Sequence, residues 1–227
     1  MNKREEEKLK RQQEKLKKEL ERTEAMSVYE KEHSDCQYIC GIDEVGRGPF
    51  AGPVVAGAVI LPKDDPILYL NDSKKLSEKK REALYDEIME RAVATGIGVV
   101  SPARIDEINI LQATFLAMRR AVEALPLPPA FALVDGNKVP PLPCPAEAVV
   151  KGDALSLSIA AASVIAKVTR DRLMCDLAKE FPYYGWEENA GYGTKTHQNG
   201  LKLHGICAHH RKSYAPIQRI IAESQKN

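Results

Sequence analysis

The chain has 227 residues, of which 44% are hydrophobic and 29% are charged. These values fit one α/β domain of ordinary size with a buried core. There is no stretch of eighteen apolar residues and no signal-peptide segment at the N-terminus, so we expect a cytoplasmic protein with no membrane contact. The five cysteines form no Cys-x-x-Cys pair and are odd in number, which indicates reduced thiols and excludes a disulfide framework or a zinc ribbon.

The net charge of +1 hides an uneven distribution of charge along the chain. Between residues 195 and 227 there is one acidic residue, Glu223, and four of the five histidines of the chain. The basic residues of the same segment are Lys195, Lys202, Arg211, Lys212, Arg219 and Lys226. A basic end on a neutral protein predicts an anionic partner on that side.

Residues 1–35 form a charged extension with ten basic and ten acidic residues. Opposite charges four residues apart, as in Glu7 with Arg11 and Glu14 with Lys18, predict an exposed helix. The leucines are too few for a coiled-coil seam. We expect a solvated helix appended to the domain, and an arm that binds nucleic acid or a protein is the alternative. Because no strand lies here, we expect the extension to be dispensable for folding.

Strands and helices alternate from residue 38 onward. Residues 38–43 are predicted to form a strand that ends in a glycine-rich loop, and the continuous apolar run 54–61 predicts a buried strand. A helix over 77–94 is expected to start at the cap residue Ser77. Residues 96–101 are predicted to form the next strand.

The second half of the domain continues this alternation. We expect a helix over 105–125 with an interruption near Asn109, a short strand at 131–134 and, after a proline-rich loop, a strand at 148–150. The helix predicted over 156–181 is rich in small residues, so it can lie close to a sheet. The pattern indicates the α/β class, with a mixed central β-sheet flanked by helices.

Acidic residues stand at the ends of three of these strands. Asp43 and Glu44 close the first strand, Asp135 closes the strand at 131–134, and Asp153 follows the strand at 148–150. If the strand ends meet at one edge of the sheet, the carboxylates would raise each other's pKa values, and Mg²⁺ or Mn²⁺ would relieve the repulsion. Two such ions can activate a water against a phosphodiester. The alternative is that single acids cap turns, as Asp135-Gly136 would in any protein.

The segment GIDEVGRGPFAGPVVAGAV (41–59) closely resembles the opening motif of the type 2 ribonucleases H. Six later segments resemble this family in the same order: NDSKKLS (71–77), LVDGN (133–137), VVKGD (149–153), AAASVIAKVTRD (160–171), GYGTKTH (191–197) and HHRKSYAP (209–216). Together they cover about residues 38–221. Within the family, Gly46-Arg47-Gly48 and Asp153 resemble the HII subgroup, whereas the HIII subgroup usually has GTG and Glu. The extension is also too short for the N-terminal domain of HIII proteins.

The resemblance implies an RNase H-like fold over residues 36–227, with a C-terminal helical segment. It also implies a catalytic and metal-binding site of four carboxylates, matched by Asp43, Glu44, Asp135 and Asp153. The implied activity is a divalent-metal endonuclease that hydrolyses the RNA strand of RNA–DNA hybrids. It would also cut on the 5′ side of ribonucleotides embedded in duplex DNA, leaving 5′-phosphate and 3′-hydroxyl ends.

Substrate recognition is predicted from two loops. Backbone groups of Gly46, Arg47 and Gly48 could approach a sugar without obstruction by side chains, beside the metals. The resemblance implies that this loop reads the ribonucleotide together with Tyr192, although a loop aromatic that covers the core edge is the alternative for Tyr192. Lys74 and Lys75 precede a helix and are candidates for phosphate contacts, with simple solvated lysines as the alternative.

Other polar residues are assigned by their spacing. Lys167 and Arg170 lie three apart on one helix, so they share a face, and we expect one of them to contact phosphate. Asp171 is predicted to form a surface ion pair with Arg170. The spacing of Cys207 and four histidines (197, 204, 209 and 210) matches no structural zinc site, so we assign them to a basic surface that follows DNA phosphates.

Two further hypotheses belong to other functional classes. One is a catalytically inactive module that binds nucleic acid, which the presence of all four acids disfavours. The other is a protein that docks to a partner through its N-terminal helix, with nuclease activity secondary. We expect a monomer, and the sequence leaves the choice between Mg²⁺ and Mn²⁺ open.

Overall fold

The structure, a computed structural model, describes residues 3–225, so Lys226 of the predicted basic end lies outside the described residues. Five strands form one sheet in the order β3-β2-β1-β4-β5. Strands β1, β2 and β3 pair antiparallel, whereas β4 is parallel to β1 and β5 is parallel to β4. The predicted mixed sheet is confirmed. The strands are β1 (Ile39–Val45), β2 (Val54–Ile60), β3 (Ala94–Val100), β4 (Phe131–Asp135) and β5 (Ala146–Val149).

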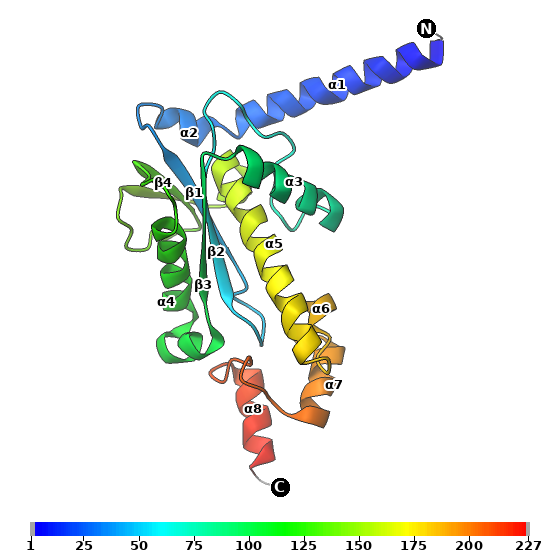
Figure 1. Ribbon diagram of the computed structural model, residues 1–227, viewed down its shortest axis with the longest axis vertical. Helices are drawn as coiled ribbons and strands as arrows, with labels where there is room; N and C mark the ends of the chain where they lie inside the picture. Colours follow the sequence, from blue (N-terminus) through cyan, green and yellow to red (C-terminus); the bar gives the residue numbers. More distant parts are fainter. Residues whose placement is uncertain (1–2, 226–227) are drawn as a thin grey trace.

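Helices cover both faces of this sheet (Figure 1). Helix α4 (Pro102–Glu123) packs on β2 and β3, while α5 (Leu157–Glu180), with α3 (Glu78–Arg91) beside it, packs on β1 and β2. The small residues of α5 allow this close approach. A Cβ on Gly41 of β1 would lie 2.0 Å from the backbone carbon of Ser158, so only glycine fits there.

One helix is interrupted as predicted, and another ends earlier than predicted. The interruption expected near Asn109 is confirmed, because Asn109 has φ 66° inside α4. Helix α3 ends at Arg91, three residues before the predicted end. Ala92 is already extended, and Ala94 begins β3. The last residue that we assigned to the helix, Ala94, therefore belongs to the sheet.

The C-terminal helical segment is also confirmed. It contains α6 (Trp186–Asn189), α7 (Lys195–His204) and α8 (Ala215–Ser224), which pack around a small core that includes Trp186. This segment lies at the end of the molecule opposite to the N-terminal helix (Figure 1). Across residues 3–225, no helix is long and apolar enough to span a bilayer.

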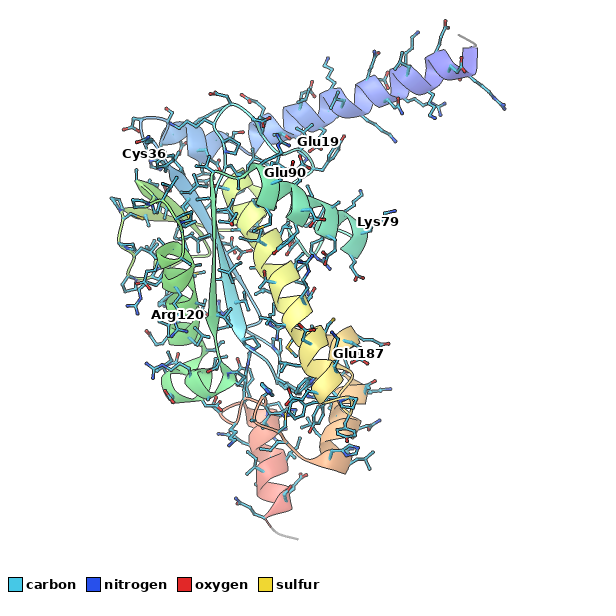
Figure 2. All side chains as sticks on the ribbon, viewed as in Figure 1. Glu19, Cys36, Lys79, Glu90, Arg120 and Glu187 are labelled. Atoms are coloured by element: carbon cyan, nitrogen blue, oxygen red, sulfur yellow. The ribbon has the colours of Figure 1, made fainter. Side chains whose placement is uncertain are left out.

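The charged extension forms α1 (Lys3–Ala25) and α2 (Val28–Glu32). Every residue of 4–18 is exposed, and this part of α1 projects from the body with its side chains in solvent (Figures 1 and 2). The helix is where we predicted it. However, among the ion pairs of the described residues, neither Glu7–Arg11 nor Glu14–Lys18 is formed.

The second half of the extension completes the N-terminus of α5. A helix leaves its first backbone N–H groups without partners inside the helix. Here the N–H of Leu157 donates to the carbonyl oxygen of Met26 (3.1 Å), and the N–H of Ser158 donates to Glu30 Oε1 (3.0 Å). The hydroxyl groups of Ser156 and Ser158 donate to the same carboxylate oxygen. Met26 itself is buried in the core beside α5.

These contacts overturn the expectation that the whole extension is dispensable. Deleting residues 1–18 should leave the melting temperature nearly unchanged, because residues 4–18 are exposed and contribute nothing to the buried core. Deleting residues 1–35 removes a buried methionine and two acceptors, and should destabilise the fold by about 2–5 kcal/mol. For a chain of this size we expect the melting temperature to fall by roughly 10 °C. Thermal unfolding of both truncations checks this, and equal melting temperatures would contradict it.

Candidate active site

The parallel pairing of β1 with β4 brings two of the predicted acids together. Ile42 is paired with Val134, so the next position on each strand places Asp43 beside Asp135. Asp135 is also paired with Val149 at the end of β5, and the chain then turns into a short 3-10 helix, η1 (Gly152–Ala154), that carries Asp153. Three strands thus deliver acids to one edge of the sheet, as predicted.

Hydrogen bonds to the backbone orient these carboxylates. Oδ1 of Asp43 accepts from the N–H of Glu44 at 2.7 Å, and Oδ1 of Asp135 accepts from the N–H of Gly152 at 2.7 Å. The second bond fixes η1, and with it Asp153, against the end of β4. Glu44 lies next to the glycine loop, with Oε1 at 3.4 Å from Nη1 of Arg47.

The electrostatics show that the four carboxylates share one site. Burial and the charges of Glu44, Asp135 and Asp153 raise the pKa of Asp43 well above its ordinary value. Burial also raises the pKa of Glu44; the guanidinium of Arg47 opposes this rise and Asp135 adds to it. The pKa of Asp153 is raised by burial, then by Asp72 and Asp135.

Asp72 is a neighbour that sequence reasoning missed. It stands in the loop before α3, and its charge helps to raise the pKa of Asp153. The signal available in the sequence was its place in the NDSKKLS segment, where we considered only the lysines. The side chains of Lys74 and Lys75 lie in the same loop and lower the pKa of Asp153, so this loop borders the acidic site.

The donor set fits a divalent cation by its charge and chemistry. Carboxylate oxygens are the ligands that Mg²⁺ and Mn²⁺ prefer, and mutual repulsion among buried carboxylates is the cost that such an ion removes. Among the described residues, no three or more His, Cys, Asp or Glu side chains are already closed around one point as a ligand set. The fit therefore rests on the raised pKa values and on the free carboxylate oxygens.

The glycine loop between β1 and β2 lies beside Tyr192. A Cβ on Gly48 would be 3.5 Å from Cε1 of Tyr192, which is 48% exposed. Gly46 has φ +94°, and a Cβ there would lie 2.2 Å from Nε of Arg170. The structure therefore brings together the loop and the tyrosine that the sequence assigned to recognition, next to Glu44.

Two buried arginines hold this loop, and sequence reasoning missed that role for both. Arg211 donates to the carbonyl oxygens of Gly46, Arg47, Gly52 and Pro53. Arg170 donates to the carbonyl oxygens of Ala51, Pro53 and Ala190. Both side chains are fully buried with no acidic partner, and burial lowers their pKa values, that of Arg170 to about 10. Backbone carbonyls of the loop thus replace water around two guanidinium groups.

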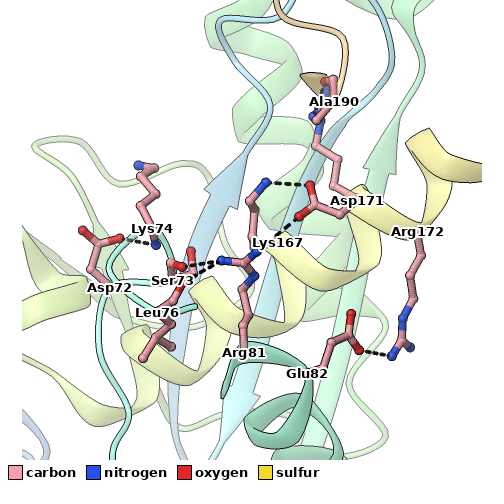
Figure 3. A network of polar contacts seen from close by, with 11 residues as sticks. Asp72, Ser73, Lys74, Leu76, Arg81, Glu82, Lys167, Asp171, Arg172 and Ala190 are labelled. Atoms are coloured by element: carbon pink, nitrogen blue, oxygen red, sulfur yellow. Dashed lines mark hydrogen bonds and ion pairs between the residues drawn. The ribbon is translucent and has the colours of Figure 1, made fainter. Parts of the chain in front are cut away.

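The expected phosphate contact of Arg170 is therefore wrong for this structure, since its donors are turned inward and occupied. The ion pair predicted for Asp171 is formed, but its partner is not Arg170. Asp171 instead pairs with Lys167 at 2.6 Å and with Arg81 at 3.8 Å (Figure 3). Lys167 remains partly exposed beside this pair. The three-residue spacing of Lys167 and Arg170 could not reveal that the second position faces the loop.

Two of the four histidines, His197 and His210, are not part of the basic surface that we predicted, whereas His204 is exposed and His209 is half-buried. His197 and His210 are buried, with their Nε2 atoms 3.0 Å apart, and Trp186 Nε1 donates to His197 Nε2. His197 Nδ1 lies 2.9 Å from the carbonyl oxygen of Tyr192, and the N–H of Cys207 donates to His210 Nδ1. Both rings can be neutral, with His210 donating to His197 Nε2, whose single lone pair is then shared by the N–H groups of His210 and Trp186. The pair supports the loop that carries Tyr192.

The model of the ribonuclease HII family matches residues 40–217. The chain belongs to the ribonuclease HII family. Ribonuclease HII of Lachnoclostridium phytofermentans is 58% identical over 193 residues, which are 85% of this chain and 76% of that protein. Ribonuclease HII of Bacillus cereus is 56% identical over 198 residues, 86% of this chain and 77% of that protein.

Solved structures agree with this assignment. Ribonuclease H2 from Pyrococcus horikoshii superposes with a TM-score of 0.71 at 27% identity, over 84% of this chain and all of that chain. The RNase HII of Archaeoglobus fulgidus, solved in a complex with PCNA, has a TM-score of 0.62 at 29% identity, over 78% and 95% of the two chains. The expected RNase H-like fold is confirmed. The protein is an endonuclease that hydrolyses the RNA of RNA–DNA hybrids.

The buried histidine pair predicts a loss of stability in acid. Burial and the neighbouring His197 lower the pKa of His210 to about 4, from an ordinary 6.5. Between these values the unfolded chain binds more protons at this residue than the folded chain, so stability falls as pH falls from 6.5 towards 4. The slope from one such group is at most about 1.4 kcal/mol per pH unit.

The test compares the free energy of unfolding of the native chain and of His210→Gln between pH 7 and 4.5. The native chain should lose more stability in acid than the variant, because only the native chain has this group. His204→Gln is the matched control, since His204 is exposed on α7. Identical pH profiles for all three proteins would show that the pair does not titrate as inferred.

Proposed function

We propose that Asp43, Glu44, Asp135 and Asp153 are the catalytic carboxylates of this ribonuclease HII and hold its divalent cations. The observation that carries this proposal is the convergence of these side chains at one edge of the sheet, where the charge of Asp135 helps to raise the pKa values of Asp43, Glu44 and Asp153. A bound Mg²⁺ or Mn²⁺ would supply an activated water and stabilise the leaving oxygen of the phosphodiester. The enzymes of this family use divalent metal ions, and the identity of the ion here is part of the proposal.

The chain's own residues prepare this site in a defined way. The backbone N–H groups of Glu44 and Gly152 each occupy one oxygen of a carboxylate, which leaves the other oxygen of Asp43 and of Asp135 for a cation. The N–H of Glu44 belongs to β1 and that of Gly152 belongs to η1. Because both are part of regular structure, the carboxylates are oriented before substrate arrives. Such preorganisation is the main protein contribution to a metal-assisted displacement.

We assign recognition of the ribonucleotide to the loop Gly46-Arg47-Gly48 and to Tyr192. The carbonyl oxygen of Arg47 accepts from Arg211 and from the hydroxyl of Tyr214, and that of Gly46 accepts from Arg211, so both oxygens face the buried arginine. Among the described residues, the N–H groups of Arg47 and Gly48 have no acceptor. These N–H groups would donate to a 2′-hydroxyl oxygen or to an adjacent phosphate. The exposed ring of Tyr192 beside Gly48 would support the neighbouring sugar.

The finer features of the reaction complete the proposal. Cleavage would occur on the 5′ side of the ribonucleotide, leaving 5′-phosphate and 3′-hydroxyl ends, in hybrids and at ribonucleotides embedded in duplex DNA. Lys74, Lys75 and Lys167 are the proposed phosphate contacts, since their ammonium groups border the acidic site or stay partly exposed on α5. The monomeric state and the cytoplasmic location stay predictions from the sequence.

Replacing Asp43 or Asp135 by Asn tests the carboxylate site. The change keeps the shape of the side chain but removes a charge that balances the cations, so we expect cleavage of a hybrid at saturating Mg²⁺ to fall by about 10³-fold or more. Without metal, the melting temperature should rise, because a buried repulsive charge is lost. Glu187→Gln, at an exposed acid of α6, is the control and should change neither property. Near-native turnover of either Asn variant would refute the assignment.

The role of Tyr192 is tested by a ratio of two rates. Tyr192→Ala removes positioning but leaves the carboxylates in place, and a displacement of roughly 1 Å can cost on the order of 10²-fold in rate. We expect this loss at a single embedded ribonucleotide, and a smaller loss on a continuous hybrid, where neighbouring ribonucleotides offer other registers. Tyr192→Phe should restore much of the rate if the ring matters more than the hydroxyl.

The matched control is Tyr183→Ala, because Tyr183 is 53% exposed and Tyr192 is 48% exposed. The control should leave both rates close to native. Equal losses of Tyr192→Ala on both substrates would mean that the ring only covers the core edge, and that the ribonucleotide is read elsewhere.

A further inference from the structure

The projecting part of α1 carries five of its seven cations on one face. Five basic residues recur at alternating intervals of four and three, which is the spacing of a single stripe along an α-helix. A second line, formed by Leu9, Leu16 and Leu20, follows the opposite side of the helix. We call the first line the basic stripe; it consists of Arg4, Lys8, Arg11, Lys15 and Lys18.

The basic stripe is exposed, and Glu7 is an acid that lies beside its first members. Every residue of 4–18 is exposed, and within the described residues no member of the stripe takes part in an ion pair. Residues 4–18 contain seven basic and four acidic residues, so this projecting part has a net charge of +3.

The charge changes sign where the extension meets the body. Residues 19–35 contain six acidic and two basic residues, and this is the part that is anchored through Met26 and Glu30 to the N-terminus of α5. Glu19, at the junction, accepts from the backbone N–H of Tyr69. The anchored part is therefore acidic and the projecting part basic, which indicates two different roles within one extension.

We propose that the basic stripe binds the phosphate backbone of the nucleic-acid duplex whose RNA strand the enzyme cleaves, at a position outside the active site. The choice of partner follows from charge complementarity, because the enzyme already holds a polyanion as its substrate. The stripe spans about 21 Å at 1.5 Å of rise per residue. A duplex presents roughly one phosphate charge per 1.7 Å, so several phosphates lie within the length of the stripe.

Two other partners are disfavoured by the same residues. A second copy of the chain would place one basic stripe against another of like charge. Of the three leucines on the opposite side of the helix, Leu20 lines a cavity together with Leu157, so Leu9 and Leu16 alone lie beyond the body. Two leucines cannot form a coiled-coil seam. A bilayer surface is disfavoured because α1 contains no aromatic residue to insert beside the cations.

The expected effect is on affinity and not on chemistry. Each cation that neutralises a phosphate releases counterions, so the logarithm of the binding constant gains a salt dependence of about 0.9 per contact. The contacts lie on an anchored helix outside the carboxylate site, so the turnover of bound substrate should not change. The stripe would act only on a duplex long enough to extend beyond the catalytic body.

The test compares two double variants of the full chain that remove equal charge from the same helix. Arg11→Gln with Lys15→Gln removes two cations of the stripe, and Lys10→Gln with Lys17→Gln removes two cations that lie off it. Binding to a labelled RNA–DNA hybrid is measured by fluorescence anisotropy with a chelator present, across a range of salt concentrations. The hybrids have about 10 and about 40 base pairs, roughly 34 and 136 Å at 3.4 Å per pair. Turnover at saturating substrate is measured with Mg²⁺.

The stripe variant should bind the long hybrid about fivefold more weakly at low salt, with a salt slope smaller by up to about 2. The off-stripe variant should change affinity by less than about twofold, and both should bind the short hybrid and turn over like the native chain. Equal losses in both variants, an equal loss on the short hybrid, or no loss at all would overturn the proposal. So would a change in sedimentation of the stripe variant, which would indicate self-association.

Discussion

Two buried guanidinium groups determine the geometry of the region between Asp43, Glu44 and the C-terminal helices. Arg170 comes from α5 and Arg211 from the segment before α8, and both donate to carbonyl oxygens of the loop between β1 and β2. A buried cation without a carboxylate partner is tolerated only when its donors are satisfied. The loop satisfies them with its backbone, so its conformation and the burial of the arginines depend on each other.

This dependence connects the residues that we propose for chemistry with those that we propose for recognition. Asp43 and Glu44 lie near the end of β1, and Gly46 and Gly48 follow within four residues of Glu44. Arg170 donates to the carbonyl oxygens of both Pro53 and Ala190, and Ala190 stands two residues before Tyr192. The histidine pair adds a second support, through His197 and the carbonyl oxygen of Tyr192. The ribonucleotide would thus be read by groups whose positions relative to the carboxylates are fixed by buried polar contacts.

The sequence predicted those parts of the protein that depend on local pattern. Apolar runs located the strands, and acids at strand ends predicted that Asp43, Asp135 and Asp153 would meet, because parallel strands end at a common edge. The roles of Arg170, Arg211, His197 and His210 could not be read in this way. Each is a polar residue that is buried by contacts with residues more than ten positions away in the sequence. The sequence around each of them is typical of surface residues. The resemblance to a family placed them in motifs without saying which way they face.

The N-terminal extension also shows that composition predicts exposure but not contacts between distant residues. Its composition predicted a solvated helix, which holds for residues 4–18, where all side chains are exposed. It gave no sign that Glu30 would serve the N-terminus of α5, because a glutamate in a charged segment has no local feature that marks an acceptor for distant N–H groups. That contact lies close to the acidic site, since α5 begins three residues after η1, which carries Asp153. An extension that looks separable by composition thus binds the segment that directly follows one of the four acids.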